Sequence, residues 1–374
     1  MKKGFIGRAT LAASIALLAA LAAVSASMAS SSKRPAPPNP LKPILQKVAG
    51  LKPAARDAKL HQLAIGEGGT VNLYTSLSKL VYPAVATAWA QAYPDIKLNI
   101  YRGASEDVYA KTVAEADAHP SNPGDVIETN GTEMLFMQHR NNVLVPYRGS
   151  PYAKAIPSKL LYDTFAADRK DTFLVAWNTS YVSAPPRTFK DLTDPKWKGH
   201  IGLEPTDVDW FAALFTYFTT QAKPKMTPAA ATAMFKAIAA NSQIINGHTE
   251  LANALASGQV WIVPDSHSQS IVALQEKGAP LEFKPAVNPV LTRGQGMGIA
   301  YGTSHPAAAL LFYDWLLSPA GQRALGAASA EPANPAFADP HLAGLTILPL
   351  DERLVVPHWV QWEKRNAQVT GTSG

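Results

Sequence analysis

The sequence predicts an α/β protein of two lobes, each with a mixed, mostly parallel sheet flanked by helices. From residue 70 onward, short apolar strand patterns alternate with longer helical patterns. This alternation is typical of parallel strands joined by crossover helices. Two extended passages, near 172–180 and 284–298, divide the alternation into two sets. A chain that leaves one lobe, builds a second and returns forms a cleft at the hinge between them.

The first set of elements defines lobe 1. Its strand patterns cover residues 71–74, 96–101, 125–128 and, on the return passage, 298–301. Its helical patterns cover residues 76–93, 105–118, a stretch from about Thr132, 306–317 and 319–325. We therefore assign residues 61–178 and 298–374 to lobe 1.

The second set defines lobe 2. It starts after the buried strand pattern at 172–177, and its own strand patterns cover residues 200–203 and 260–263. Its helical patterns cover residues 207–220, 249–256 and 268–277. We assign residues 179–297 to this lobe, with the two extended passages as the hinge.

The N-terminal end predicts an export signal over residues 1–29. Lys2, Lys3 and Arg8 precede an apolar run over residues 10–24, and Ser27-Met28-Ala29 is a cleavage site of the small-x-small type. The run is shorter than the ~20 residues that a membrane-spanning helix needs, so we expect cleavage and a periplasmic location.

Residues 30–60 predict a basic, Pro-rich lead-in followed by a short helix. The helical section at 44–68 has two interpretations, because it either packs on lobe 1 or only tethers it.

Composition and charge exclude several classes of function. The 374 residues contain 34 Lys and Arg against 28 Asp and Glu, a formal charge of +6. Residues 1–60 hold ten of the basic side chains and one acid, which leaves 24 basic and 27 acidic residues, a net charge of −3, in the remainder. The basic excess is therefore a property of the leader and gives no support to a nucleic-acid partner. The absence of cysteine excludes disulfides, thiol catalysis, Cys-ligated metals and a lipid-anchor Cys.

Candidate ligand-binding residues lie where strands pass into helices. In an open α/β sheet, ligands bind beyond the carboxyl ends of the strands, where helix N-termini present free N–H groups. Five junctions carry small, hydroxyl-bearing or titratable residues, namely Thr75-Ser76, Asn130-Gly131-Thr132, Thr206-Asp207, Gly247-His248-Thr249 and Asp265-Ser266-His267. Each junction alone is explained by helix capping, but five of them facing one cleft indicate a site.

A few further residues have two interpretations each. Trp177 and Trp210 are either apolar walls of the cleft or core residues. Arg102 follows the second strand and Arg293 lies in the return passage, and each is either an anion partner or a surface residue. Catalytic motifs such as G-x-S-x-G and H-E-x-x-H are absent, so we expect no enzymatic activity and no cofactor.

Several phrases of the sequence resemble one protein family. The stretch 188–199, TFKDLTDPKWKG, is the most specific of them, and residues 67–76, 125–128, 255–260, 305–309 and 316–322 match in the expected order. Over residues 60–330 the chain is similar to the type II periplasmic solute-binding proteins of ABC importers, in extracellular solute-binding family 1 and its branch around the ferric-iron binders. The resemblance implies a monomeric two-lobed receptor that closes over one solute and delivers it to a membrane permease with an ATPase.

The resemblance also implies which junctions hold the solute. Thr75 and Ser76 form the first-lobe ligand loop with Asn130 and Thr132 beside them. The second-lobe candidates are Thr206, Asp207, His248, Thr249 and His267.

The identity of the solute depends on one departure from the family pattern. Ferric-iron binders of this branch carry a Tyr-Tyr pair where this sequence has Ser268-Gln269. We therefore expect a small polar solute that is anionic or zwitterionic, because neutral donors at helix N-termini suit an anionic group. The alternatives are ferric iron or another metal or metal chelate and, beyond transport, a solute sensor or a secreted enzyme.

Overall fold

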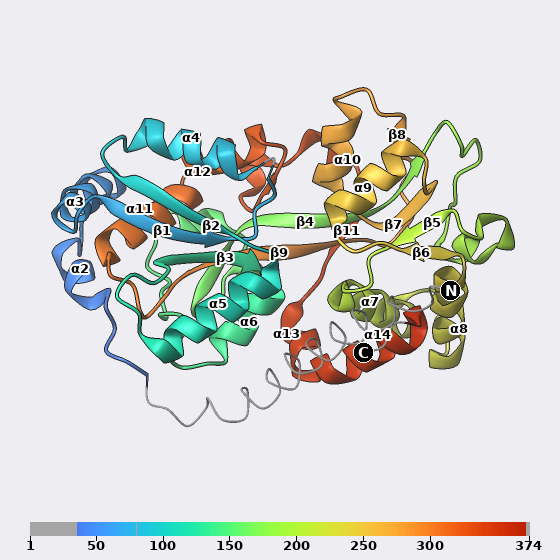
Figure 1. The fold of residues 1–374 in the computed structure, drawn as a ribbon, viewed down its shortest axis with the longest axis horizontal. Coiled ribbons are helices and arrows are strands. Elements are labelled where there is room, and N and C mark those ends of the chain that lie inside the picture. Colours follow the sequence, from blue (N-terminus) through green and yellow to red (C-terminus); the bar gives the residue numbers. More distant parts are fainter. Residues whose placement is uncertain (1–35, 80, 372–374) are drawn as a thin grey trace, which may run out of the picture.

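One mixed sheet of eleven strands runs through the whole molecule (Figure 1). The structure, a computed structural model, describes residues 36–79 and 81–371, so the predicted signal peptide lies outside the described residues. The strand order is β2-β1-β3-β9-β4-β7-β5-β6, and β8, β10 and β11 pair with β4 or β9. This arrangement confirms the predicted α/β class. None of the helices in the described ranges combines the length and apolarity needed to cross a membrane.

The strands follow the predicted order along the chain. They are β1 (Thr70–Thr75), β2 (Lys97–Arg102), β3 (Val126–Asn130), β4 (Phe165–Asn178), β5 (Ile201–Leu203), β6 (Ser242–Ile244), β7 (Ile262–His267), β8 (Leu281–Glu282), β9 (Val290–Ile299), β10 (Glu331–Pro332) and β11 (Ile347–Pro349). Strands β1, β2 and β3 are parallel, as are β5, β6 and β7, while β9 and β4 run antiparallel to their neighbours between these two groups. We call the β1–β3 side the first lobe and the β5–β7 side the second lobe.

The α-helices cover both faces of the sheet. They are α2 (Lys42–Lys47), α3 (Pro53–Gly66), α4 (Tyr82–Ala92), α5 (Ser105–Ala118), α6 (Gly131–Gln138), α7 (Val208–Thr216), α8 (Pro228–Ala240), α9 (His248–Ser257), α10 (Ser268–Gln275), α11 (Pro306–Leu317), α12 (Pro319–Ala327), α13 (Glu352–Val355) and α14 (Trp359–Thr370). In Figure 1, α4 and α12 lie above the first lobe and α5 and α6 below it, while α9 and α10 lie above the second lobe and α7, α8 and α14 below it.

Strands β4 and β9 are longer than the sequence patterns predict, and both lobes share them. The predicted strand at 172–177 is only the second part of β4, because Asp168, Arg169 and Asp171 interrupt the apolar pattern of its first part. In the antiparallel register of β4 and β9, Arg169 lies opposite Gln295 and Asp171 opposite Arg293. The shared strands therefore place charged side chains in the middle of the sheet, at the junction of the lobes.

The section before β1 packs on the first lobe. Leu60 and Ala64 of α3 are buried in the same core as Trp89 and helix α11. Arg56 donates from Nε to Asp314 Oδ2 at 2.7 Å, and both side chains are buried. Helices α2 and α3 are thus part of the first-lobe core, which resolves the choice left open by the sequence between packing and a tether.

The second lobe buries both tryptophans that the sequence offered as cleft walls. Trp177 and Trp210 are 2% and 5% exposed and lie in the second-lobe core. Trp177 lies within β4, opposite Ile262 of β7. The ring of Trp210 packs near Phe235, with ring centroids 6.4 Å apart. Of the two interpretations of these rings, the structure favours the core, because both fill the space between sheet and helices in the second lobe.

The C-terminal part of the chain crosses between the lobes. Helix α14 packs against α7 and α8 of the second lobe, whereas the predicted division places all of 298–374 in lobe 1. The physical reason is the packing of Trp362 against Phe215, with ring centroids 5.8 Å apart. The sequence patterns gave no element beyond residue 325, so this crossing was not foreseen.

Candidate functional site

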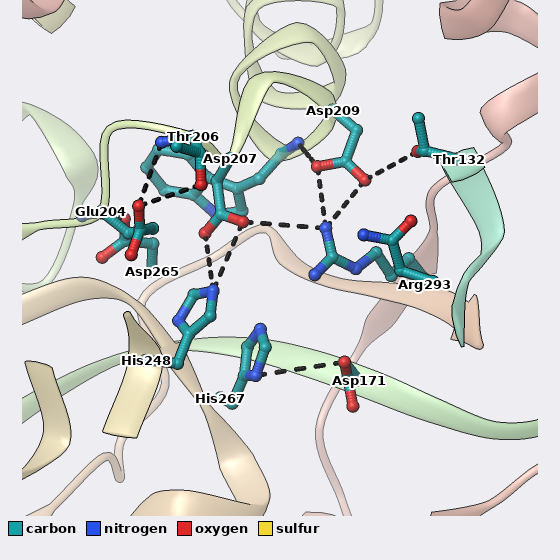
Figure 2. Close-up of polar contacts among 12 residues, drawn as sticks. Thr132, Asp171, Glu204, Thr206, Asp207, Asp209, His248, Asp265, His267 and Arg293 are labelled. Atoms are coloured by element: carbon teal, nitrogen blue, oxygen red, sulfur yellow. Dashed lines mark hydrogen bonds and ion pairs between the residues drawn. The ribbon is translucent and has the colours of Figure 1, made fainter. Parts of the chain in front are cut away.

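The two lobes touch where helices α6 and α7 begin (Figure 2). Asn130 ends β3 and caps α6, since its Oδ1 accepts from the Glu133 backbone N–H at 3.1 Å. This turn places Thr132 in the first turn of α6, where its hydroxyl donates to Asp209 Oδ2 at 3.2 Å. Thr132 and Asp209 are 1% and 2% exposed. The lobes are therefore in direct contact through a buried polar bridge.

Arg293 of β9 lies at the centre of this contact. Its Nη1 donates to both carboxylate oxygens of Asp209, at 3.0 and 2.9 Å, and lies 3.7 Å from Asp207 Oδ1. Its guanidinium lies over the ring of Phe173, 5.0 Å from the centroid. Burial alone would lower the pKa of Arg293, but the Asp209 and Asp207 carboxylates outweigh burial and raise it. A fixed positive charge therefore stands between the lobes.

Two histidines stack beside Arg293. His248 begins α9 after Gly247, whose φ of 95° makes the turn into the helix, and its Nε2 lies 3.3 Å from Asp207 Oδ2. The rings of His248 and His267 are 3.5 Å apart between centroids. Burial opposes the charge on His248, but Asp207 outweighs it and raises the pKa of His248 to about 9. Burial, and then the charge of His248, lowers the pKa of His267 to about 3. One ring of the pair is therefore positive and the other neutral near pH 7.

A second buried ion-pair cluster surrounds Arg169 on the first-lobe side. Arg169 contacts Asp171 Oδ1 at 2.7 Å, Glu128 Oε1 at 3.1 Å and Gln295 Oε1 at 3.5 Å. Burial would raise the pKa of Asp171, but Arg169 outweighs burial and lowers it to about 2. His267 joins this cluster to the first one, because its Nδ1 lies 4.0 Å from Asp171 Oδ2.

The first-lobe junction at Thr75 belongs to the Arg169 cluster. The Thr75 hydroxyl donates to Glu128 Oε2 and accepts from the Leu77 backbone N–H at 2.9 Å. The Ser76 backbone N–H donates to the Glu128 carbonyl at 3.0 Å. Arg102 is exposed and donates from Nε to the Leu77 carbonyl at 3.1 Å. Each of these groups has protein partners, so the structure gives them a capping or structural role at this junction.

The second-lobe junctions divide into residues that face the charged cluster and residues that do not. Asp207 and His248 face it, as Figure 2 shows. Thr206 is exposed, and its hydroxyl donates to Glu204 Oε1 at 3.0 Å. The Gly247 backbone N–H donates to the other oxygen of Glu204, and Thr249 is exposed on α9. The structure does not bring Thr206 and Thr249 to the cluster. The Glu204 carboxylate accepts hydrogen bonds from the turn before α7 and from the turn before α9, and so fixes the conformation of both turns.

Several buried polar atoms in and next to the cluster lack a hydrogen-bond partner among the described residues. His248 Nδ1, His267 Nε2 and Arg293 Nε have no hydrogen-bond partner among the residues that the structure describes. The hydroxyls of Ser266 and Ser268, on either side of His267, share this property. Buried polar atoms are normally paired in native proteins, so this group is suited to accept a polar ligand.

Sequence reasoning missed part of the site. It did not single out Asp209, because this residue lies in the first turn of α7, after the junction residues Thr206 and Asp207, nor Asp171, Arg169 and Gln295, because they lie within strands. The run Asp168-Arg169-Lys170-Asp171 next to the apolar stretch 172–177 is the signal that could have found two of them, since charges inside a buried strand must be paired. No three His, Cys, Asp or Glu side chains within residues 36–79 and 81–371 come together in a way that could hold a metal ion.

A comparison of the sequence with protein families gives one match. The model of the bacterial extracellular solute-binding proteins matches residues 84–342, which is more than half of the chain. No curated protein sequence matches this chain closely enough to count as a relative.

Solved structures with the same fold match this chain over nearly the whole of their own length. They include iron-bound HitA from Pseudomonas aeruginosa (18% identity, TM-score 0.64, covering 79% of this chain and 99% of the other). AfuA from Actinobacillus pleuropneumoniae, solved with fructose-6-phosphate bound, has 23% identity and a TM-score of 0.68, and the match covers 82% of this chain and 99% of AfuA. The Atu4243 GABA receptor has 16% identity and a TM-score of 0.66, with 82% and 98% covered. These matches identify the fold as that of periplasmic binding proteins.

Proposed function

Since this chain belongs to the bacterial extracellular solute-binding proteins, we propose that it captures a small polar solute with an anionic group between its two lobes. The solute is an anion or a zwitterion. The protein acts in the periplasm as the binding component of an ABC importer and hands the solute to the membrane permease, without catalysing a reaction.

One observation carries the proposal, namely the buried positive charge at the contact of the lobes. Arg293 lies on a strand that both lobes share, whereas its carboxylate partners Asp207 and Asp209 belong to the second lobe. The charged ring of His248 lies beside it, stacked on the ring of His267, and His248 Nδ1 and Arg293 Nε have no hydrogen-bond partner among the described residues. A carboxylate, phosphate or phosphonate would satisfy these donors with charge-assisted hydrogen bonds.

The same cluster also suits a zwitterionic solute. If the anionic group of the solute pairs with Arg293, the carboxylates of Asp207 and Asp209 lose this guanidinium as a partner. Unpaired buried carboxylates are costly, and an ammonium group on the solute would neutralise them. GABA, which a structural neighbour binds, has this combination of charges.

Binding of a free metal ion has less support from the geometry. His248 and His267 stack face to face at 3.5 Å between centroids, and imidazoles stacked in this way do not direct their nitrogens at one point. The described residues contain no group of three metal-binding side chains, so a metal would have to bring its own ligands as a chelate.

A thermal-shift panel tests the proposal, because a ligand that binds only the folded state raises its melting temperature. The panel contains fructose-6-phosphate, GABA, inorganic phosphate, 2-aminoethylphosphonate, putrescine and ferric citrate. We expect an anionic or zwitterionic compound to stabilise the protein. The double variant R293Q/D209N should lose at least about 30-fold in affinity for that compound, as expected for removal of a buried charged hydrogen-bond partner.

The double variant is chosen because it removes the two charges together and leaves no buried ion unpaired. The matched control is R102Q, which removes an exposed arginine of the first lobe. Stabilisation by putrescine alone, or an unchanged affinity of R293Q/D209N, would contradict the proposed function.

A further inference from the structure

The C-terminal segment passes from one lobe to the other across the site. After β11, the chain descends to α13 between the lobes and then runs as α14 below α7 and towards α8, packing against both helices (Figure 1). Strand β11 pairs with the shared strand β9, and α13 packs against both α6 and α7. These are the two helices whose first turns meet through Thr132 and Asp209. We call residues 347–370 the C-terminal clasp.

The first part of the clasp is anchored to the first lobe. The Glu352 side chain is 1% exposed, and its Oε2 accepts from the Tyr162 hydroxyl at 2.8 Å. Its Oε1 lies against Gly131, the first residue of α6, where an added Cβ would be only 2.7 Å away. The ring of Trp359 packs edge-on against Phe136 of α6, with centroids 5.4 Å apart.

The second part of the clasp is anchored to the second lobe. Trp362 packs against Phe215 and Phe211 of α7, with ring centroids 5.8 and 6.3 Å away. Asn366 donates from Nδ2 to the Pro205 carbonyl at 2.7 Å, in the turn between β5 and α7. Val369 is buried in the second-lobe core. Aromatic contacts and a buried hydrogen bond thus hold α14 firmly to this lobe.

The two sets of anchors are close together in the sequence. Glu352 and Trp359 hold the first lobe, and Trp362 follows Trp359 within the same helix α14. A helix of this kind does not stretch, because its rise is fixed at about 1.5 Å per residue. The lobes therefore cannot separate at α6 and α7 while both sets of contacts persist.

We propose that the C-terminal clasp holds the two lobes in the closed arrangement, and that opening of the site requires release of its first-lobe anchors, Glu352 and Trp359. The first-lobe end also includes Arg353, which donates from Nη2 to the Lys159 carbonyl at 2.9 Å and lies over the Tyr162 ring, and Val356, which is buried in a first-lobe core. Glu352 and Trp359 are the two contacts of this end with α6 that a single substitution can remove, while α14 remains packed on the second lobe. The role of the clasp in solute exchange rests on the proposed function. Its effect on the separation of the lobes does not depend on that function.

Spin-label distances between the lobes test the clasp without any solute. The chain has no cysteine, so the variant Q91C/K236C carries labels only on the exposed faces of α4 and α8. In this doubly labelled variant, we expect E352A and W359A each to add a population of molecules in which the two spin labels lie further apart. The combined variant should populate the longer distance more than either single variant, because each substitution removes one of the two first-lobe anchors.

Three further variants make the result decisive. Y181A removes an exposed aromatic ring of the second lobe outside the clasp and should leave the distances unchanged. G131A keeps every clasp residue but places a methyl group 2.7 Å from Glu352 Oε1 and 2.8 Å from the Gly294 carbonyl oxygen of β9, and it should open the lobes at least as far as E352A does. N366A, at the second-lobe end, should shift the distances less than either. Distance distributions of E352A and G131A that match the parent variant would overturn the proposal, whatever the outcome of the solute panel.

Discussion

Arg169 and Arg293 are both buried guanidinium groups in the middle of the same sheet, but their partners differ in kind. The partners of Arg169 are Asp171, Glu128 and Gln295, which all lie on the adjacent strands β4, β3 and β9. The partners of Arg293 are Asp207 and Asp209, which lie at the start of α7 in the second lobe. A movement of the lobes leaves the first set together and separates the second.

This difference distinguishes a structural ion pair from one that can exchange its partners. Strand-to-strand contacts are fixed by the register of the sheet, in which Arg169 lies opposite Gln295. The contacts of Arg293 depend on the position of a helix that belongs to one lobe. A ligand can replace Asp209 on Arg293 when the lobes part, whereas nothing in a hinge motion frees Arg169.

The largest effect is expected from loss of the Arg169 charge. The variant R169M leaves the buried carboxylates of Glu128 and Asp171 without their cation. Breaking a buried ion pair on one side costs about 3–5 kcal/mol, so the free energy of unfolding in urea should fall by that amount. The exposed R102Q should change it by less than about 0.5 kcal/mol. Equal unfolding curves for R169M and R102Q would show that the Arg169 cluster is not structural.

A smaller, pH-dependent effect is expected at His267, which connects the two clusters. The pKa of His267 is lowered to about 3 in the folded protein, while an unperturbed histidine has a pKa of about 6.5. The unfolded chain therefore binds a proton between these values that the folded chain does not. As the pH falls from about 6.5 towards 3, this difference lowers the folding constant by up to about tenfold per pH unit.

The variant H267N removes this titration. Its unfolding free energy, measured in urea at pH 7 and pH 4.5, should fall less between the two values than that of the wild type. The exposed His139 provides the control, since H139N should keep the wild-type dependence on pH. The prediction fails if H267N and the wild type lose the same free energy on acidification.

Much of the fold could be predicted because apolar periodicity reports local structure directly. The predicted helix at 105–118 coincides with α5 (Ser105–Ala118), and the predicted helix at 306–317 with α11. Strand β4 was predicted only in part, since its first half carries charges whose pairing with β3 and β9 is a tertiary property. The clasp could not be predicted for a similar reason. Trp359 contacts Phe136 of the first lobe and Trp362 contacts Phe215 of the second, and the sequence does not show these tertiary contacts.

The junctions that meet at the contact of the lobes could be predicted from the sequence, but the direction of individual side chains could not. Asp207, His248 and Thr132 do face the contact of the lobes, as the reasoning from helix N-termini predicts. Thr206 precedes Asp207 directly and nevertheless points to Glu204. The turn between strand and helix decides which of two neighbouring side chains faces the site, and the hydrogen bonds that fix this turn come from residues outside the junction.

The smallest effect separates Thr132 from Thr206, which the sequence treats as equivalent. T132V removes the hydroxyl that donates to Asp209 across the lobes while keeping the volume of the side chain. A hydrogen bond contributes about 1 kcal/mol, so affinity for the panel compound that stabilises the wild type should fall about fivefold by calorimetry. T206V, whose hydroxyl contacts only Glu204, should change it by less than about twofold. If T206V weakens binding as much as T132V, the site extends over the exposed turn after β5, and the closed contact of Arg293, Asp209 and Thr132 is not its centre.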